Sequence, residues 1–516
     1  MKKGLTLLLA AVMLMSALAG CKNSADTNTK DGAPVDTSSQ TSTSDGSANG
    51  DAASNETVKL LYVIPGDAPA DLDRGLKAVN DKLVADGVGV EIELKFFPWD
   101  VWDQKLNIML STGEEFDMFH VMNDRVSLSN YASRGALADL TTYIDQYGSA
   151  IKAANPDLAM KSGQVNGKQY GIPAYWVESA LNHQATIRTD ILKKYNLEMP
   201  TTFAELTSAY EIVMKNWDGA QKPYFPIAGT EQVGGYFFNS DNNYVLYDKM
   251  FYVGQDGSVK NYFETDAFKE SCENARIWYE KGLINPDVLT IAHDQVENQI
   301  NSGDWFVHAG TMGDISNMKK NYPDITVDDF AWLDFDTATP EIRPYGTRNM
   351  QAVPLSSRHP EAAVKFINWL YSDQDNFDLF VYGTEGVDYK KLDGKNYEAM
   401  LDQTTGQVPY SIANWMIGNV SFEYTSKNFP KVTNEHLYNI DSTAVEGYAS
   451  QFTFDGSKVQ IQLADVNTQI AAMIALMASG VVDYDSHIEE ALELLRKAGI
   501  DDLVAEFKSQ LEAGRQ

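Results

Sequence analysis

The sequence predicts an α/β protein built from two lobes. The chain has 516 residues, which is more than one hydrophobic core usually supports. Hydrophobic residues make up 44% of it and aromatic residues 11%, so it can bury large cores and is not a disordered acidic tail. Strand and helix patterns alternate from residue 57 onward, which indicates parallel strands joined by right-handed crossovers.

Residues 1–20 are predicted to be an export signal rather than part of the fold. A short basic start precedes an apolar run from Leu5 to Leu18, which is shorter than a membrane-spanning helix requires. The run ends in Leu18-Ala19-Gly20-Cys21, which resembles a bacterial lipobox whose Cys21 is lipidated. An ordinary secretory signal with an incidental cysteine is the alternative. Lipidation would anchor the protein at the extracytoplasmic face of the cell membrane.

Residues 21–56 are predicted to be the lipidated cysteine and a flexible tether. They contain no aromatic residue, and small polar residues dominate, so they cannot bury enough surface to offset their ordering entropy. No later stretch is expected to span a membrane, because Asp465, Asn467 and Gln469 interrupt the apolar residues that follow Ala464.

The folded part is expected to begin with a strand and a helix. Residues 57–64 are rich in aliphatic and β-branched side chains and are closed by Pro65-Gly66, which is typical of a strand and turn. Residues 71–84 place apolar side chains at positions 72, 76, 79 and 83, which is the spacing of an amphipathic helix.

The alternation continues along the chain. A strand at 88–97 bounded by Pro98, a helix at 102–110 and a short buried strand at 117–121 are expected next. Apolar periodicity predicts further helices at 203–216, 268–281, 361–371, 459–479, 487–498 and 501–512. Ligands of such sheets bind beyond the carboxyl ends of the strands.

Five motifs in a fixed order carry a family resemblance. They are 111–118 (STGEEFDM), 166–173 (NGKQYGIP), 188–206 (RTDILKKYNLEMPTTFAEL), 357–371 (SRHPEAAVKFINWLY) and 382–389 (YGTEGVDY). In this order they resemble bacterial extracellular solute-binding proteins of family 1, the lipoprotein receptors of ABC importers. The last motif and the tail from 453 to 516 are similar to a subgroup with an extra C-terminal domain of unknown function.

The resemblance implies a type II periplasmic-binding-protein-like fold, in which two lobes joined by a hinge close on a solute in the cleft between them. It assigns 57–173 and 350–388 to the N-terminal lobe, and 174–349 and 389–516, with the C-terminal extension, to the C-terminal lobe. The usual ligands of the family are sugars or oligosaccharides, and the closed form is read by the permease of the importer. A monomer without a cofactor is expected.

Aromatic residues are the first candidates for contact with a sugar, because their flat faces pack against C–H surfaces. Trp99 follows the second strand, Tyr175 and Trp176 follow the first crossing between lobes, and Trp305 stands at the start of a predicted strand. Packing in the core is the alternative for each of them.

Polar candidates lie at similar positions. Asn123 and Asp124 follow the strand at 117–121 and are expected either to bind a ligand or to cap a loop. Arg348 lies where the family's chain crosses back, and it would bind ligand hydroxyls or form an ion pair. Glu385, in the last motif, is expected to fix the hinge rather than accept ligand hydroxyls.

Several classes of function are excluded or left as alternatives. With 72 acidic against 41 basic residues and a net charge of −31, nucleic-acid binding is not expected. The seven histidines are scattered and there are only two cysteines, Cys21 and Cys272, so no metal site is expected. No nucleophile or metallohydrolase motif occurs. A binder of peptide or another polar solute, a secreted glycoside hydrolase, and a surface adhesin or co-receptor remain as alternatives.

Overall fold

The computed structural model describes residues 57–176, 185–228, 240–310, 312–333, 335, 339–432, 435 and 443–514. All of these belong to one unit of the chain, Asn55–Gln516. The predicted signal peptide, Cys21 and the tether lie outside the described residues.

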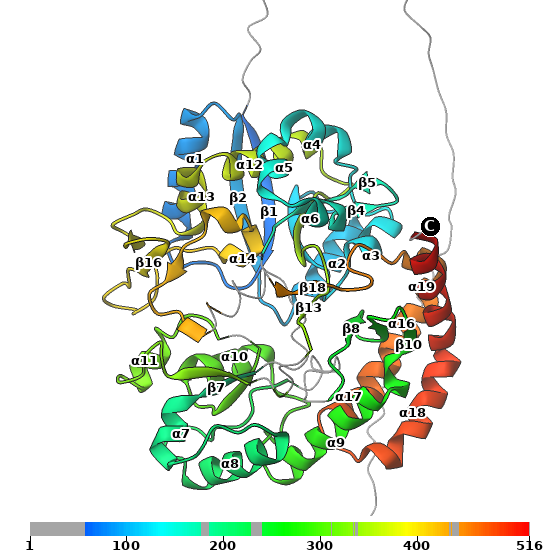
Figure 1. Cartoon of the computed structure of the whole chain (residues 1–516). Helices are drawn as coiled ribbons and strands as arrows, with labels where there is room; N and C mark the ends of the chain where they lie inside the picture. Colours follow the sequence, from blue (N-terminus) through cyan, green and yellow to red (C-terminus); the bar gives the residue numbers. More distant parts are fainter. Residues whose placement is uncertain are drawn as a thin grey trace, which may run out of the picture. The chain divides into compact units, whose positions relative to one another are not determined.

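Five strands form the first sheet, in the order β2 (Val90–Phe97), β1 (Val58–Pro65), β3 (Met118–Met122), β14 (Asn349–Ala352) and β6 (Gly171–Pro173) (Figure 1). The strands predicted near residues 57–64, 88–97 and 117–121 are confirmed as parallel neighbours. β14 runs antiparallel to both β3 and β6. The carboxyl ends of β1, β2, β3 and β6 therefore meet the first residue of β14 at one edge of the sheet.

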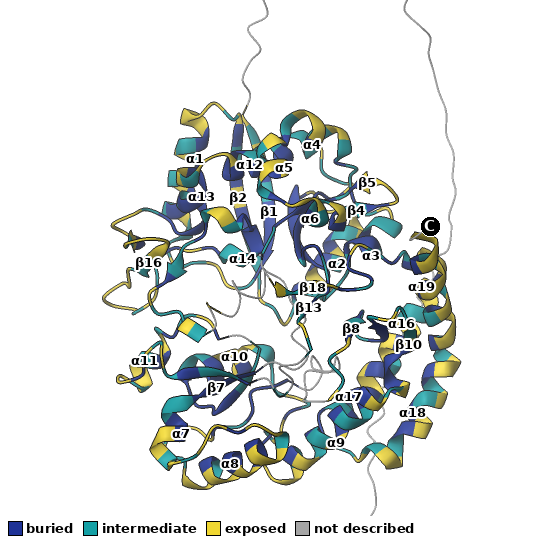
Figure 2. Cartoon of the chain, viewed as in Figure 1, coloured by how far each residue is buried: buried dark blue, intermediate teal, exposed yellow. Residues whose placement is uncertain are grey.

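Helices cover both faces of this sheet. They are α1 (Leu72–Ala85), α2 (Trp102–Thr112), α3 (Leu128–Ser133), α12 (Pro360–Ser372) and α13 (Gln374–Val381). Tyr62 and Ile64 of β1 pack with α1, α12 and α13, whereas Val63 packs with α2 and α3. Because alternate side chains of a strand point to opposite faces, β1 is apolar nearly throughout. Figure 2 shows its inner strands as buried.

A second sheet contains β11 (Val307–Ala309), β7 (Ala185–Arg188) and β12 (Phe330–Leu333), and both neighbours run antiparallel to β7. Its cluster includes residues of α7 (Thr189–Tyr195), α8 (Phe203–Asn216) and α9 (Asp266–Glu280), whereas α10 (His293–Ser302) packs in a neighbouring cluster. α8 begins where predicted, because the Thr202 hydroxyl accepts a hydrogen bond from the Glu205 amide at 3.2 Å.

The C-terminal helices pack against a three-stranded antiparallel sheet. Its strands are β8 (Tyr244–Tyr247), β9 (Phe251–Gly254) and β10 (Val259–Asn261). The helical segments are η3 (Gly456–Val459), α16 (Gln460–Gln469), the π-helical turn η4 (Ile470–Ile474), α17 (Ala475–Ala478), α18 (Tyr484–Ala498) and α19 (Ile500–Gly514). Phe251 stacks on Phe507 of α19 with ring centroids 4.4 Å apart. The C-terminal extension thus shares one core with residues 244–261.

One helical stretch, Gly456–Ala478, is long and apolar enough to cross a membrane by length and composition. By that criterion the expectation that no stretch after the signal qualifies is wrong. The polar residues Asp465 and Asn467 are exposed, while Val466, Ile470 and Ile474 are buried in the cluster with β8–β10. Only 33% of its most apolar stretch is buried, so one face packs on the core and the other is exposed, as in an amphipathic helix.

The remaining described elements are short. They are α4 (Thr141–Tyr147), α5 (Ser149–Ala154), α6 (Asp157–Ser162), β4 (Gln164–Val165), β5 (Lys168–Gln169), η1 (Tyr262–Glu264), α11 (Met318–Asn321), β13 (Ile342–Arg343), β15 (Tyr389–Lys391), β16 (Asn396–Ala399), α14 (Asn414–Ile417), η2 (Val420–Phe422), β17 (Thr425–Ser426) and β18 (Val445–Glu446).

Residues 389–424 pack beside the first sheet. Tyr389, Tyr410 and Met416 are buried in the same cluster as β1 and α1. The sequence-based division assigned this segment to the C-terminal lobe, and its packing differs from that assignment. The reason is a space on α1 at Gly75, which the ring of Tyr410 fills.

Gly75→Ala is expected to lower the free energy of unfolding by about 1–3 kcal/mol, although alanine is the better helix former by about 1 kcal/mol. An added Cβ would lie 2.1 Å from Cδ2 of Tyr410. That ring is fully buried, and its hydroxyl donates to the carbonyl of Phe380 at 2.9 Å, so it cannot move aside without losing the bond. Urea unfolding measures the change. Gly313→Ala, with no atom within 4 Å of the added Cβ, is the control. Equal stability of both variants would contradict the packing.

Candidate functional site

The edge where the strands of the first sheet end gathers the strongest candidate residues. The chain turns there after β1 at Gly66, after β2 at Trp99, after β3 at Asn123 and after β6 at Tyr175, and it enters β14 from Arg348. The amide of Asn123 donates to the carbonyl of Arg348 at 2.9 Å, so two of these turns are joined directly. We call this place the carboxyl edge.

Two tryptophans form a stacked pair at the carboxyl edge. The rings of Trp99 and Trp415, which lies in α14, have centroids 6.1 Å apart and planes inclined by 18°. Both side chains are half-buried. The guanidinium of Arg125 lies 5.5 Å from the centre of the Trp99 ring, and the His120 ring meets Trp415 edge-on at 5.8 Å. The pair therefore offers flat apolar surface next to polar groups.

The charged groups at the carboxyl edge are paired with one another. Nη1 of Arg348 donates to Oδ2 of Asp124 at 3.1 Å, and Nη2 of Arg125 donates to Oδ2 of Asp103 at 2.9 Å. The two arginine cations and the two aspartate anions therefore carry no net charge together. Oδ1 of Asp124 and Nε of Arg125 are buried and have no hydrogen-bond partner among the described residues. These atoms are an acceptor and a donor that a polar ligand can satisfy.

His120 adds no charge to the carboxyl edge at neutral pH. Its side chain is fully buried, and Nε2 lies 3.2 Å from Oδ1 of Asn349. Burial lowers its pKa from 6.5 to about 4, although the hydrogen bond with Asn349 raises it in part. The ring is therefore neutral at pH 7.

The buried His120 is expected to make the fold sensitive to acid. The folded state binds the proton less tightly than the unfolded chain, so the contribution of His120 is fully present above pH 6.5 and is lost as the pH falls toward 4. Between pH 7 and pH 4.5 the wild type should lose about 2–3 kcal/mol of unfolding free energy more than His120→Asn. Urea titrations of both proteins at the two pH values measure this difference. Parallel losses would contradict it.

The structure sorts the other predicted residues. Asn123 is buried and its Oδ1 accepts from the amide of Leu128 at 3.0 Å, so it holds the start of α3 as a loop cap. Asp124, Trp99 and Arg348 lie together at the carboxyl edge as described above. Tyr175 and Trp176 follow β6 and are half-buried, and the residues after them are outside the described part.

Two predicted candidates lie elsewhere. The structure places Trp305 in the core, where it is fully buried and its indole donates to the carbonyl of Ile300 at 3.0 Å. This is the alternative that the sequence left open, and it leaves no ring surface for a ligand. Glu385 is exposed in a turn paired with Tyr389. Asp388 fastens this turn to Arg74 of α1 (Nη1–Oδ2, 3.1 Å), and within the described part of the chain Glu385 forms no hydrogen bond or ion pair with the carboxyl edge.

The sequence did not identify four residues of the site: Trp415, Arg125, Asp103 and His120. Arg125 carried a usable signal, since it directly follows Asn123 and Asp124 after a strand. Trp415 carried no such signal, because it reaches the carboxyl edge only through the packing of residues 389–424, which no motif indicated.

Among the described residues no group of three His, Cys, Asp or Glu side chains is arranged to hold a metal ion. Two loop aspartates make local hydrogen bonds instead. Asp241 accepts a hydrogen bond from the hydroxyl of Tyr252 at 2.7 Å, and Asp483 caps α18 by accepting one from the amide of Ser486. Cys272 is buried in α9, and burial raises its thiol pKa.

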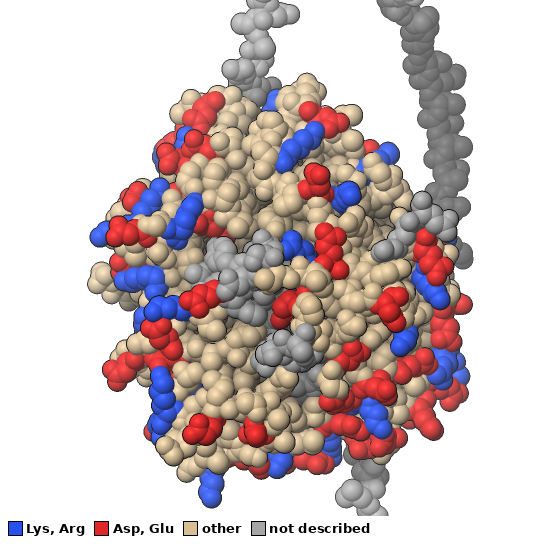
Figure 3. Space-filling model, viewed as in Figure 1, with Lys and Arg blue, Asp and Glu red and all other residues tan. Residues whose placement is uncertain are grey.

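Acidic side chains are most numerous, on the face drawn in Figure 3, over the region of α9 and α18. On this face the acidic side chains thus gather over outer helices, whereas the charges of the carboxyl edge cancel.

Comparison with known proteins adds to this geometry. A model of a family described as bacterial extracellular solute-binding protein matches residues 69–377, and one described as a domain of unknown function (DUF3502) matches residues 448–514. The predicted resemblance, including the C-terminal domain, is confirmed.

Two curated proteins are similar over most of the chain. One is a carbohydrate ABC transporter substrate-binding protein of Streptococcus pneumoniae serotype 4, 25% identical over 462 residues, which covers 87% of this chain and 89% of the relative. Lipoprotein LipO of Bacillus subtilis is 21% identical over 548 residues, covering 100% of this chain and 99% of the relative.

A solved structure supports the fold. The chain is similar to the N-glycan transport solute-binding protein NgtS of Streptococcus pneumoniae in complex with Man1GlcNAc, with a TM-score of 0.71 and 21% identity. The match covers 88% of this chain and 99% of that one. The predicted periplasmic-binding-protein-like fold is confirmed.

Proposed function

The chain belongs to the bacterial extracellular solute-binding protein family, and on that premise we propose that it captures a carbohydrate, an oligosaccharide, for an ABC importer. The ligand binds at the carboxyl edge, between the two lobes, and the lobes close on it by a hinge movement. The closed form delivers the ligand to the permease. Similarity to a carbohydrate transporter component and to a glycan-binding protein supports this assignment.

One observation at the carboxyl edge carries the proposal. The stacked rings of Trp99 and Trp415 lie beside buried polar atoms of Asp124 and Arg125 that have no partner among the described residues. Aromatic faces bind the C–H surfaces of a sugar ring, and a carboxylate with a guanidinium brackets its hydroxyls. Because the charges of the edge cancel, a neutral saccharide fits better than an ionic peptide.

A thermal-shift screen tests the proposal. Neutral oligosaccharides of different length and linkage, charged oligosaccharides and peptides are added to the purified protein, since a ligand of the folded state raises the midpoint by mass action. We expect at least one neutral oligosaccharide to raise the midpoint, and to raise it by less in a Trp99→Ala/Trp415→Ala variant. A shift with peptides alone would refute the carbohydrate assignment. We expect the sugar to be recovered unaltered, and newly released reducing ends would instead indicate a glycoside hydrolase.

We further propose that Cys21 carries a lipid that anchors the protein to the outer face of the cell membrane, and that residues 22–56 tether it there. Similarity to a protein named as a lipoprotein supports this. Cys21→Ser is expected to shift the protein almost entirely from the membrane fraction to the medium, because lipid chains alone hold a tethered domain of this kind at the bilayer. Immunoblots of the two fractions measure this, and unchanged membrane association would contradict it.

A further inference from the structure

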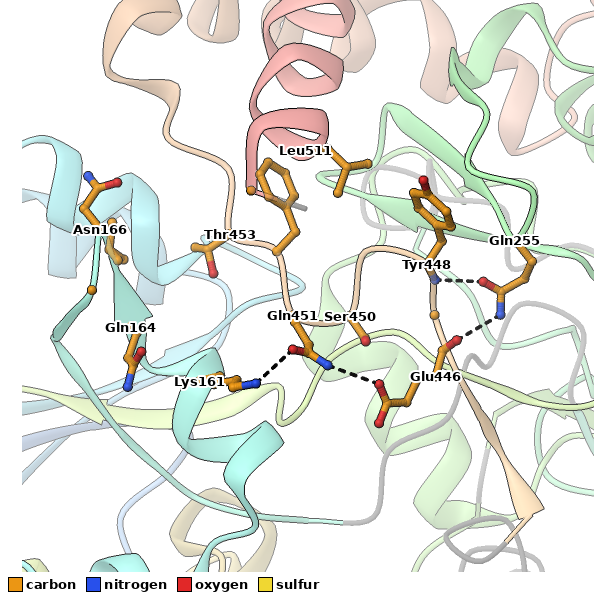
Figure 4. A pocket seen from close by; sticks show the side chains of 15 residues that line it. Lys161, Gln164, Asn166, Gln255, Glu446, Tyr448, Ser450, Gln451, Thr453 and Leu511 are labelled. Carbon is orange, nitrogen blue, oxygen red and sulfur yellow. Dashed lines mark hydrogen bonds between the residues drawn. The ribbon is translucent and has the colours of Figure 1, made fainter. Parts of the chain in front are cut away.

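A second polar pocket lies apart from the carboxyl edge. It has a volume of about 880 Å³. One wall is formed by the end of α6 and the β4–β5 hairpin, and the other by residues 446–453, with Gln255 and the end of α19 completing it (Figure 4). None of the residues described at the carboxyl edge lines it.

A hydrogen-bonded chain joins the two walls of this pocket. Nζ of Lys161 donates to Oε1 of Gln451 at 3.2 Å, and Nε2 of Gln451 donates to Oε2 of Glu446 at 3.3 Å. Gln255 is held from both ends, by the carbonyl of Glu446 at 3.2 Å and the amide of Tyr448 at 2.8 Å. Figure 4 shows these side chains linked in a row. The amide groups are therefore oriented before any ligand arrives, which lowers the cost of binding.

Other polar side chains of the lining lack partners. Within the described residues no hydrogen bond is made by the side chains of Gln164, Asn166, Ser450 and Thr453. Amides and hydroxyls of this kind bind the hydroxyl groups of a neutral ligand. Among the described residues of the lining, only Lys161 and Glu446 are charged, and their charges cancel, so these residues do not select an ionic ligand.

The pocket also has aromatic surface. The rings of Tyr448 and Phe452 contribute to its lining. Phe452 is steadied by an edge-on contact with Phe507, with centroids 5.0 Å apart. A Cβ at Gly257 would lie 2.6 Å from the Tyr448 ring, so that ring packs directly on the β9–β10 turn. Fixed rings beside amides and hydroxyls are the combination that suits one or two sugar residues.

We propose that this pocket is a second binding site for a neutral saccharide or similar polyol, separate from the carboxyl edge. The proposal does not require that the carboxyl edge binds sugar. Because the two walls belong to segments far apart in the chain, a bound ligand favours the arrangement in which they lie this close.

Titration calorimetry on the full chain tests the second site. The probes are maltotriose and the disaccharide mannosyl-N-acetylglucosamine, and the carboxyl edge is disabled by Trp99→Ala/Trp415→Ala. We expect at least one probe still to bind. Adding Gln164→Leu and Thr453→Val, which remove hydrogen-bonding groups at nearly constant volume, is expected to weaken that binding about tenfold or more.

A matched pair of substitutions controls for general effects. Gln403→Leu and Thr404→Val change the same residue types in an exposed turn that lines neither site, and they should leave the binding unchanged. Failure of both probes to bind the tryptophan variant, or equal binding after the pocket substitutions, would overturn the proposal. A failure of the proposed sugar binding at the carboxyl edge would be seen separately. In that case the wild type and the tryptophan variant would bind the probes with equal affinity.

Discussion

Trp415→Ala is expected to weaken the binding of the transported oligosaccharide about 30- to 100-fold, which corresponds to about 2–3 kcal/mol. Trp415 stacks on Trp99 and receives the edge of His120, so its removal takes away one face of the aromatic surface and exposes the other ring to water. The side chain is only half-buried, and the fold should survive. Titration calorimetry with the sugar identified in the thermal-shift screen measures the change.

Trp217→Ala is the matched control for this prediction. Trp217 is also half-buried, but it lies beside Tyr322, with ring centroids 6.4 Å apart, beyond α8. Its loss should leave affinity unchanged within about twofold. An equal loss of affinity in both variants would mean that the effect is general destabilisation. Unchanged affinity in Trp415→Ala would remove the tryptophan pair from the binding site.

Local patterns were sufficient to predict the first strands and helices. β1 is an aliphatic run ended by Pro65, and α1 places its apolar residues three and four apart, so periodicity and turn residues define both without tertiary information. The same holds for α18 and α19. The five motifs lie in segments that fold into different sheets, and their order along the chain predicted the family.

Relations between distant segments could not be predicted in the same way. Trp305 and Trp99 each lie at a strand end in the sequence, yet one is in the core and the other at the carboxyl edge. The two residues differ in the helix that packs against them. The indole of Trp305 donates a hydrogen bond to the Ile300 carbonyl of α10, whereas Trp99 faces α14. Periodicity within one segment carries no information about which segment will pack against it.

The position of α14 shows which kind of signal was missing. The segment 389–424 returns to the first sheet because Tyr410 fills the space over Gly75 and Gln351 of β14 donates to the carbonyl of Met416 at 2.6 Å. Each contact joins residues far apart in the chain, and neither residue type is unusual by itself. The aromatic half of the site thus depends on long-range packing that a single sequence does not reveal.

Gly418→Ala is expected to lower the free energy of unfolding by about 3 kcal/mol or more and to weaken sugar binding as well. Gly418 ends α14 with φ +83° and ψ −158°, a region that is essentially restricted to glycine and costs about 1–3 kcal/mol for other residues. An added Cβ would also lie 2.4 Å from the backbone carbon of Ala174 and 2.7 Å from the nitrogen of Tyr175. Backbone atoms of a paired strand end cannot rotate away as a side chain can.

Two readouts separate the strain at Gly418 from its effect on the site. Gly406→Ala shares a positive φ of +66°, but its nearest neighbour is the flexible Nζ of Lys320 at 3.5 Å, so it should lose only about 1 kcal/mol in urea unfolding. Calorimetry below the unfolding temperature then compares sugar affinity. Because α14 carries Trp415, pushing α14 from Ala174 and Tyr175 displaces one ring of the tryptophan pair, and affinity should fall in Gly418→Ala alone. Wild-type affinity in that variant would mean that the pair does not depend on how α14 meets the end of β6.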